Sequence, residues 1–338
     1  MKQSCTLVTG SAGFIGSHVA HVLLDRGEQV IGLDNLNDYY DVQLKQDRLD
    51  RLLAHPAYHH VHAELADREA IEQLFADYRP SRVVHLAAQA GVRYAAKNPH
   101  AYTNSNVTGF LHILEGCRHG GVEHLVFAST SSVYGANEAM PFSEHQSTEH
   151  PLTLYAATKK ANEMMAHSYA HLYGFPCTGL RFFTVYGPWG RPDMALFLFT
   201  RAILNDEPIQ VFNHGRHKRS FTYIDDIVEG VVRVLDQPAR QDAQWSGESP
   251  DPARSSAPYR LFNIGNETQV DLLRYIQVLE DCLGKKAVME MRPLQPGDVP
   301  DTEADVSELI QAVDYRPKVD VEAGVARFVE WYRAYYEV

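Results

Sequence analysis

The stretch TLVTGSAGFIGSHV, Thr6–Val19, places three glycines between a short β-branched run and the start of a helical segment. Gly10, Gly13 and Gly16 allow the backbone to turn tightly and to lie against a pyrophosphate. The amide groups and the positive dipole end of the following helix can hold such an anion. A glycine triad alone is weak evidence, because glycines also mark ordinary turns. Its position between a strand and a helix predicts a dinucleotide-binding loop.

An acidic residue supports this prediction. Asp34 ends the second predicted strand, 18 residues after Gly16 (34 − 16). A carboxylate at this place in a βαβ unit accepts hydrogen bonds from the adenosine ribose hydroxyls and repels a 2′-phosphate. The sequence therefore favours NAD over NADP. In HLAAQAG, His85–Gly91, the small side chains of Ala87 and Ala88 let the backbone approach the cofactor after another predicted strand.

Short β-branched runs alternate with amphipathic stretches up to Phe183, which predicts a parallel sheet covered by helices on both faces. We expect an α/β fold: a Rossmann-type doubly wound parallel sheet over 1–183, to which the chain returns around 221–240, and a smaller C-terminal α/β substrate-binding lobe over 184–338. Gln237–Pro258 has the composition of a surface loop. Asp225 and Asp226 are predicted to cap a helix. The expected strands are Thr6–Thr9, Gln29–Asp34, Arg82–Ala87, His124–Ser129, Cys177–Phe183 and Arg260–Ile264.

Composition excludes several classes of function. The formal net charge of −12 argues against sequence-independent binding to nucleic acid or to an anionic membrane, which both need a basic surface. Four scattered cysteines without a CxxC pair fit a reducing compartment, and no signal peptide is evident. We therefore expect a cytoplasmic protein. His167 and His171 share a helix face, but no third ligand has a supportive spacing, so we expect no metal.

The candidate catalytic pair is Tyr155 and Lys159 in YAATK. A free phenol is a poor base, with a pKa of about 10. A lysine ammonium at i,i+4 and the positive nicotinamide ring both favour the phenolate and so lower that pKa. The YxxxK pattern is common on exposed helices, and it gains weight here because it follows the glycine motif. We predict that Tyr155 moves a proton in redox chemistry on NAD.

A hydroxyl-rich strand end precedes this pair in FASTSSVYG, Phe127–Gly135. The carboxyl ends of parallel strands are where open α/β sheets bind ligands. The hydroxyl of Thr130 can therefore bridge a substrate oxygen and the Tyr155 phenol. For Ser129 and Ser131, ordinary turn chemistry is an equally good explanation.

These motifs resemble the extended short-chain dehydrogenase/reductase superfamily, and several longer stretches are similar to UDP-glucuronate 4-epimerases. The similar stretches are DNLNDYYD (Asp34–Asp41), AAQAGVRY (Ala87–Tyr94), RFFTVYGPWGRPDMALF (Arg181–Phe197) and FTYIDDIVEG (Phe221–Gly230). The resemblance implies an NAD-dependent homodimer that interconverts UDP-glucuronate and UDP-galacturonate. Two departures concern fine geometry: Ser220 and Glu64 each stand where the family usually has Asp.

The resemblance also implies the site residues. It assigns catalysis to Thr130, Tyr155 and Lys159. Cofactor contacts fall on the same Tyr155 and Lys159 and on Gly10, Gly13, Phe14, Ile15, Gly16, Asp34, Asn35, Leu65, Ala87, Ala88 and Gln89. Substrate contacts fall on Val92, Arg93, Ser131, Ser132, Thr184, Arg191 and Arg219, with Arg191 near the sugar carboxylate and Arg219 on the UDP pyrophosphate. Pro293–Pro300 resembles a nucleotide-contacting loop.

Three alternatives stay open. UDP-glucuronate decarboxylases and related dehydratases typically have Glu before VYG, where this chain has Ser132. A UDP-glucose/UDP-galactose 4-epimerase would act on a neutral sugar, against which Thr184 and Arg191 argue. A non-catalytic NAD(H)-binding sensor would have no use for Thr130, Tyr155 and Lys159.

Overall fold

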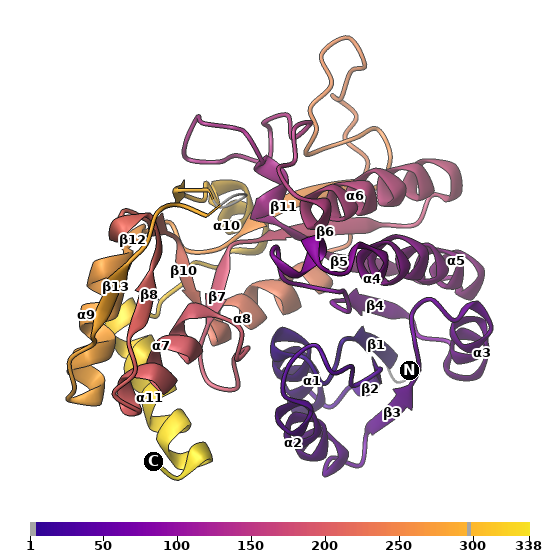
Figure 1. The fold of residues 1–338 in the computed structure, drawn as a ribbon. Helices are drawn as coiled ribbons and strands as arrows, with labels where there is room; N and C mark the ends of the chain where they lie inside the picture. The colour runs from indigo at the N-terminus through magenta and orange to yellow at the C-terminus, as the bar shows by residue number, and fades with distance from the viewer. Residues whose placement is uncertain (1–4, 296–298) are drawn as a thin grey trace.

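The computed structural model describes residues 5–295 and 299–338. Its centre is a seven-stranded sheet in which every pair of neighbours is parallel, in the order β11-β6-β5-β4-β1-β2-β3 (Figure 1). The predicted α/β fold with a doubly wound parallel sheet is confirmed. The strands are β1 (Cys5–Thr9), β2 (Gln29–Asp34), β3 (Tyr58–His62), β4 (Arg82–His85), β5 (His124–Thr130), β6 (Cys177–Phe182) and β11 (Tyr259–Ile264).

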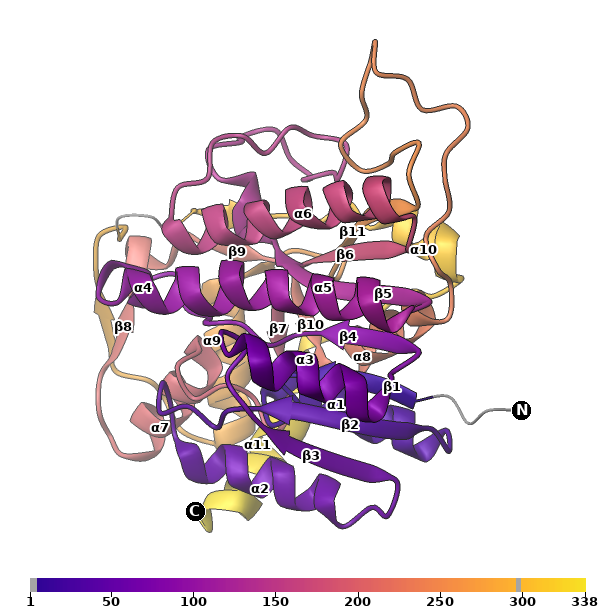
Figure 2. The ribbon, with the colours of Figure 1, turned by 90° about the vertical axis from the view of Figure 1, so that its right-hand side faces the viewer.

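Both faces of the sheet are apolar, as burial on both sides requires. In β1, Leu7 packs into the core under one helical layer and Val8 into the core under the other. Figure 2 looks onto the first layer, which is formed by α3 (Arg68–Tyr78), α5 (Gly109–Gly120) and α6 (Leu154–Tyr173). The opposite layer contains α1 (Phe14–Asp25), α2 (Val42–Leu53) and α8 (Ile224–Leu235). Ahead of α5 run α4 (Pro99–Tyr102) and a π-helical segment, η2 (Thr103–Thr108).

The remaining elements form small sheets and helices beside the carboxyl ends of the main strands. β7 (Thr184–Tyr186) pairs with β10 (Phe221–Tyr223), and β8 (Ile209–Val211) pairs with β13 (Met289–Met291). β9 (Lys218–Arg219) lies between β12 (Val270–Asp271) and β14 (Asp301–Thr302). The helices of this region are α7 (Ala195–Leu204), α9 (Leu272–Leu283), α10 (Ser307–Val313) and α11 (Val321–Tyr336). Short 3₁₀ turns are η1 (Tyr94–Ala96), η3 (Ser131–Tyr134) and η4 (Phe212–Gly215).

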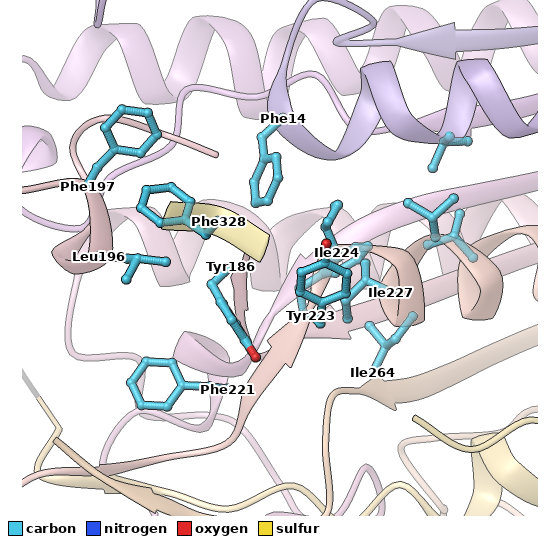
Figure 3. Close-up of a cluster of buried hydrophobic side chains, with 14 of the residues drawn as sticks. Phe14, Tyr186, Leu196, Phe197, Phe221, Tyr223, Ile224, Ile227, Ile264 and Phe328 are labelled. Atoms are coloured by element: carbon cyan, nitrogen blue, oxygen red, sulfur yellow. The ribbon is translucent and has the colours of Figure 1, made fainter. Parts of the chain in front are cut away.

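One buried cluster connects the main sheet with this C-terminal region. It includes Phe14 of α1, Tyr223 of β10, Ile227 of α8 and Phe328 of α11 (Figure 3). Because the chain also re-enters the main sheet at β11, the division into 1–183 and 184–338, with a return around 221–240, stays a prediction. The segment between α8 and β11, predicted as a surface loop, contains neither helix nor strand and projects from the body (Figure 1).

Asp226 has a different role from the predicted one. The expectation that Asp225 and Asp226 cap the helix is wrong, because α8 has no side-chain cap at its N-terminus. The Asp226 carboxylate is buried and accepts hydrogen bonds from the Tyr315 hydroxyl and from the amides of Lys318 and Val319. It therefore holds the segment before α11 against α8. Across 5–295 and 299–338, no helix is long and apolar enough to cross a membrane.

A buried ion pair fixes α6 on the sheet. The Arg181 guanidinium of β6 donates to both Glu163 oxygens of α6, at 2.8 and 2.9 Å. The Ser129 hydroxyl of β5 also donates to Glu163, at 2.7 Å. Arg181 is 0% and Glu163 is 1% exposed, so neither charge has water as an alternative partner. The position of α6 relative to β5 and β6 depends on this pair.

Glu163→Gln should destabilise the protein by about 3–5 kcal/mol, because it leaves the Arg181 cation buried without its counter-charge. The measurement is urea unfolding followed by circular dichroism. The matched control is Glu322→Gln, which removes the same charge from an exposed pair with Arg274 and should cost at most about 1 kcal/mol. Equal effects of the two substitutions would contradict the structural role of the Glu163–Arg181 pair.

Candidate active site

A cavity of about 1170 Å³ opens at the carboxyl ends of the main strands and extends toward the C-terminal region. Every predicted site residue lines it. On the sheet side these are Gly10, Gly13, Phe14, Ile15, Gly16, Asp34, Asn35, Leu65, Ala87, Ala88, Gln89, Thr130, Ser131, Ser132, Tyr155 and Lys159. From the remaining segments come Val92, Arg93, Thr184, Arg191 and Arg219. The structure therefore brings together residues that the sequence separates by up to 209 positions (219 − 10).

The glycine loop is built for close backbone contact. Gly10 has φ +72°, and a Cβ there would lie 2.9 Å from the Ala87 amide nitrogen. A Cβ on Gly16 would lie 2.0 Å from the Gly10 carbonyl oxygen, so no side chain fits. α1 begins at Phe14, and its first i→i−4 bond runs from the Ser17 amide to the Gly13 carbonyl. The amides of Phe14, Ile15 and Gly16 precede that bond and can bind an anion, which fits a dinucleotide pyrophosphate.

Asp34 also supports the glycine loop. One carboxylate oxygen accepts from the Ala12 amide at 3.0 Å, and the other accepts from the Leu36 amide at 2.9 Å. Next to it, the Asn35 side-chain amide donates to Glu64 at 2.7 Å, so this unusual Glu positions a predicted cofactor contact. Each carboxylate oxygen of Asp34 has a further lone pair for a ribose hydroxyl.

Lys159 lies one turn after Tyr155 on α6, and only 2% of it is exposed. Burial lowers the pKa of Lys159 to about 8, although the negative charge of Glu163 acts in the opposite direction. The surroundings of Lys159 therefore bring its pKa close to neutral pH. Fully buried lysines shift in this direction because a low dielectric disfavours the charged form.

The phenol of Tyr155 behaves differently from the sequence-based expectation. Burial raises the pKa of Tyr155, while the charge of Arg191 and a hydrogen bond from Thr130 lower it. Lys159 is not among the groups that lower this pKa, and burial outweighs the charge of Arg191, so the lowering expected from Lys159 is not found. The lowering expected from the nicotinamide ring stays a prediction. A positive nicotinamide ring would add to the charges that favour the phenolate.

The hydroxyls at the end of β5 divide into two groups. The Ser129 hydroxyl donates to Glu163, which makes it part of the support for α6. The Thr130 hydroxyl accepts from the Ser132 amide at 3.2 Å, starts η3 and is one of the groups that lower the pKa of Tyr155. Thr130 and Tyr155 line the same cavity, and the catalytic role of Thr130 stays a prediction.

Arg191 has a partner that the sequence analysis missed. Its Nε and Nη2 lie 3.0 and 2.6 Å from the two carboxylate oxygens of Asp193. The Tyr39 hydroxyl, which belongs to the loop after β2, donates to the same Asp193 carboxylate at 3.1 Å. An acid two residues after the arginine in GRPD was the available signal, but nothing in the sequence placed Tyr39 beside it.

Two other predicted substrate residues also have protein partners. Arg219 donates to the carbonyls of Val299 and Pro300, each at 2.5 Å. It thereby positions the end of the Pro293–Pro300 segment, of which Pro296, Gly297 and Asp298 lie outside the described residues. The Arg93 guanidinium lies 5.2 Å from the centre of the Phe212 ring.

A second missed residue is Asn106, which lies in the π-helical segment. Its side-chain oxygen accepts from the Gln89 amide at 2.8 Å and its nitrogen donates to the Gln89 carbonyl at 3.1 Å. The same amide nitrogen lies 3.1 Å from the Thr158 hydroxyl of α6. Asn106 thus links the Ala87–Gln89 segment to α6, the helix that carries Tyr155 and Lys159, and only the three-dimensional fold reveals this.

Comparison with known proteins agrees with this geometry. The chain is 58% identical over 98% of its length to 99% of an uncharacterized 37.6 kDa protein of Escherichia coli O111:H-. It is 48% identical, over 96% of both chains, to a probable UDP-glucuronate 4-epimerase of Rhizobium meliloti. A solved structure of UDP-glucuronic acid 4-epimerase from Bacillus cereus, in complex with UDP-glucuronic acid and NAD, superposes with a TM-score of 0.86 at 30% identity, over 98% of this chain and 100% of that one.

The family match covers most of the chain. Residues 6–264 match the NAD dependent epimerase/dehydratase family, and this range contains the glycine loop, Asp34, Thr130, Tyr155 and Lys159. The glycine loop has the shape and the amide donors that a pyrophosphate needs, and Asp34 has the acceptors that a ribose needs. The chain therefore belongs to the NAD dependent epimerase/dehydratase family, and its cofactor is NAD.

Proposed function

We propose that the protein interconverts UDP-glucuronate and UDP-galacturonate by inverting C4 through a transient 4-keto sugar. One observation carries the proposal: a single cavity is lined by the dinucleotide loop, by Tyr155 with Lys159 and Thr130, and by the Arg191 cation, whose charge acts on Tyr155. A cation at that place suits a sugar with a carboxylate. The names of the Rhizobium and Bacillus relatives support the same substrate.

Tyr155 is the proposed acid and base. Its phenolate takes the proton from the sugar 4-hydroxyl, and the phenol returns that proton when C4 is reduced again. In this proposal Thr130 assists the phenol by hydrogen bonding, and Arg191 contributes positive charge. Lys159 lies one helical turn after Tyr155 on the same helix, and its proposed role is to steady the phenolate once substrate and cofactor are bound. When bound, NAD supplies reversible acceptance of a hydride at C4. Positioning of C4 and general base catalysis supply the rate acceleration.

The carboxylate must be restrained during this cycle. A 4-keto uronate is a β-keto acid, which loses CO₂ when the carboxylate bond aligns with the carbonyl π system. We propose that Arg191 and Thr184 hold the carboxylate out of that alignment while the ring turns, with Ser131 or Ser132 helping. All four line the cavity. Ser132 stands in place of the Glu that elimination chemistry would use, which disfavours the decarboxylase and dehydratase alternatives.

One incubation separates the candidate activities. Purified protein with UDP-glucuronate should give UDP-galacturonate of unchanged mass, resolved by stereochemistry and mass spectrometry. A product lighter by CO₂ would indicate a decarboxylase, and activity only on UDP-glucose would indicate the neutral-sugar epimerase. No change of any sugar would favour the NAD(H)-binding sensor.

We further propose that the protein is a homodimer. α5 and α6 lie side by side on the outside of the sheet (Figure 2). They carry exposed apolar side chains, among them Leu111, Met164 and Leu172. Burying such side chains against a second copy would be favourable, and sedimentation measurements test this.

Tyr155→Phe should lower turnover of UDP-glucuronate by about 10²–10⁴-fold, because the proton at O4 loses its acceptor. NAD should remain bound, since the glycine loop is unchanged. The control is Tyr173→Phe at the exposed end of the same helix, which should turn over normally. Near-normal turnover by Tyr155→Phe would refute the assignment.

Arg191→Ala should weaken binding of UDP-glucuronate by about tenfold or more, or release CO₂ from part of the substrate, because a charge-assisted contact is lost. Binding of UDP-glucose, which has no carboxylate, should change little. Calorimetry and product mass measure the two effects. If both substrates respond equally and no CO₂ forms, Arg191 does not recognise the carboxylate.

Turnover should fall as the pH rises through about 8, because the pKa of Lys159 lies there and the charged ammonium is the active form. Lys159→Arg keeps a positive charge at every accessible pH. Its residual activity should therefore lack this alkaline decline. A pH–rate profile from pH 6 to 10 checks both, and an identical decline in the two proteins would contradict the role of Lys159.

A further inference from the structure

The contact between Arg191 and Asp193 has a consequence for substrate selection. A guanidinium offers five N–H groups in a fixed fork. Asp193 occupies the Nε edge of Arg191, with distances of 3.0 Å from Nε and 2.6 Å from Nη2. The Nη1 edge of the guanidinium faces away from this contact and remains for another acceptor. The protein thus provides its own carboxylate at the cation proposed to bind the sugar carboxylate.

Asp193 is held in its charged form. The Arg191 charge and its hydrogen bonds lower the pKa of Asp193 against the opposing effect of burial. Tyr39 adds a hydrogen bond to the same carboxylate. Neighbouring residues confine Tyr39. Its hydroxyl oxygen lies only 2.1 Å from the position that a Cβ on Gly91 would take, and its ring centre lies 4.9 Å from that of Tyr94. Asp193 is therefore a fixed negative charge in the cavity wall.

The backbone that carries Arg191 is fixed as well. The fully buried Arg48 of α2 donates to the carbonyls of Trp189 and Gly190, both at 2.7 Å. Arg48 also donates to the Ala12 carbonyl of the glycine loop at 3.2 Å. Because this segment is tied to the cofactor loop, the backbone that leads into Arg191 has a fixed position beside the cavity.

We propose that Asp193 is a specificity-determining positioning residue, a resident carboxylate that competes with the sugar carboxylate for Arg191. It directs the remaining edge of the guanidinium to the substrate and keeps that contact weak enough for the keto sugar to turn. The inference rests on the proposed epimerisation of UDP-glucuronate. Its consequence is opposite to that of ordinary structural damage: neutralising Asp193 should tighten uronate binding and slow turnover.

The test compares Asp193→Asn with the parent protein. In a Tyr155→Phe background, which prevents turnover, calorimetry should show a Kd for UDP-glucuronate lower by about three- to tenfold. The Kd for UDP-glucose should stay within about twofold, since that sugar has no carboxylate to compete. With Tyr155 present, Asp193→Asn should lower KM and kcat for UDP-glucuronate together.

The charge-matched control is Asp236→Asn, which removes one negative charge from an exposed pair with Arg26 and Arg82 outside the cavity. It should leave both Kd values unchanged. If Asp193→Asn fails to fold, as judged by circular dichroism and retained NAD, Asp193→Ser replaces it with the same expected results.

An unchanged or higher Kd for UDP-glucuronate would overturn the inference. An equal decrease in the Kd for UDP-glucose, or an equal decrease in the Kd for UDP-glucuronate in Asp236→Asn, would overturn it as well. Either result would mean that the tighter binding is a general response to charge. Failure of the proposed function is distinguishable: in that case the parent protein itself would not epimerise UDP-glucuronate.

Discussion

The ion pair between Glu163 and Arg181 is the constraint on which the site depends. Two buried charges hold α6 against β6, and Ser129 adds a bond from β5. This contact lies one helical turn beyond Lys159 and two beyond Tyr155. It therefore sets the distance between the helix that carries the phenol and the strand end that carries Thr130. The same Glu163 supports the charge of Lys159 electrostatically.

Burial shifts the pKa values of the two central groups of the site, Tyr155 and Lys159, and makes the site depend on its cofactor. Removal from water raises the pKa of Tyr155 and lowers that of Lys159, so both groups are driven toward their neutral forms. The charge of Arg191 and the hydrogen bond from Thr130 oppose this for the phenol. The balance suits a base that becomes effective only when a positively charged nicotinamide is also present. Such coupling would protect the phenol from proton transfer without a redox partner.

The sequence predicted the sheet well because its central strands are apolar on both faces. Gln29–Asp34 was located to the residue, and the other expected strands differ by one or two positions at their ends. β3 was missed, since an edge strand reading YHHVH lacks the continuous apolar run of a buried strand. Asp226 was misassigned as a cap because its true partners lie about ninety residues away in the chain.

The predicted site residues line one cavity. The hydrogen bonds and ion pairs that these residues make could not be predicted from the sequence. A sequence motif predicts which residue types a site contains. The contacts of Asp193 with Arg191 and Tyr39 depend instead on how two loops that are distant in the sequence pack together. The most direct test of the account follows deuterium from UDP-[4-²H]glucuronate by NMR and mass spectrometry. The account predicts UDP-galacturonate that keeps both its deuterium at C4 and its carboxylate. Loss of the deuterium to solvent in a stereochemically inverted product would contradict it.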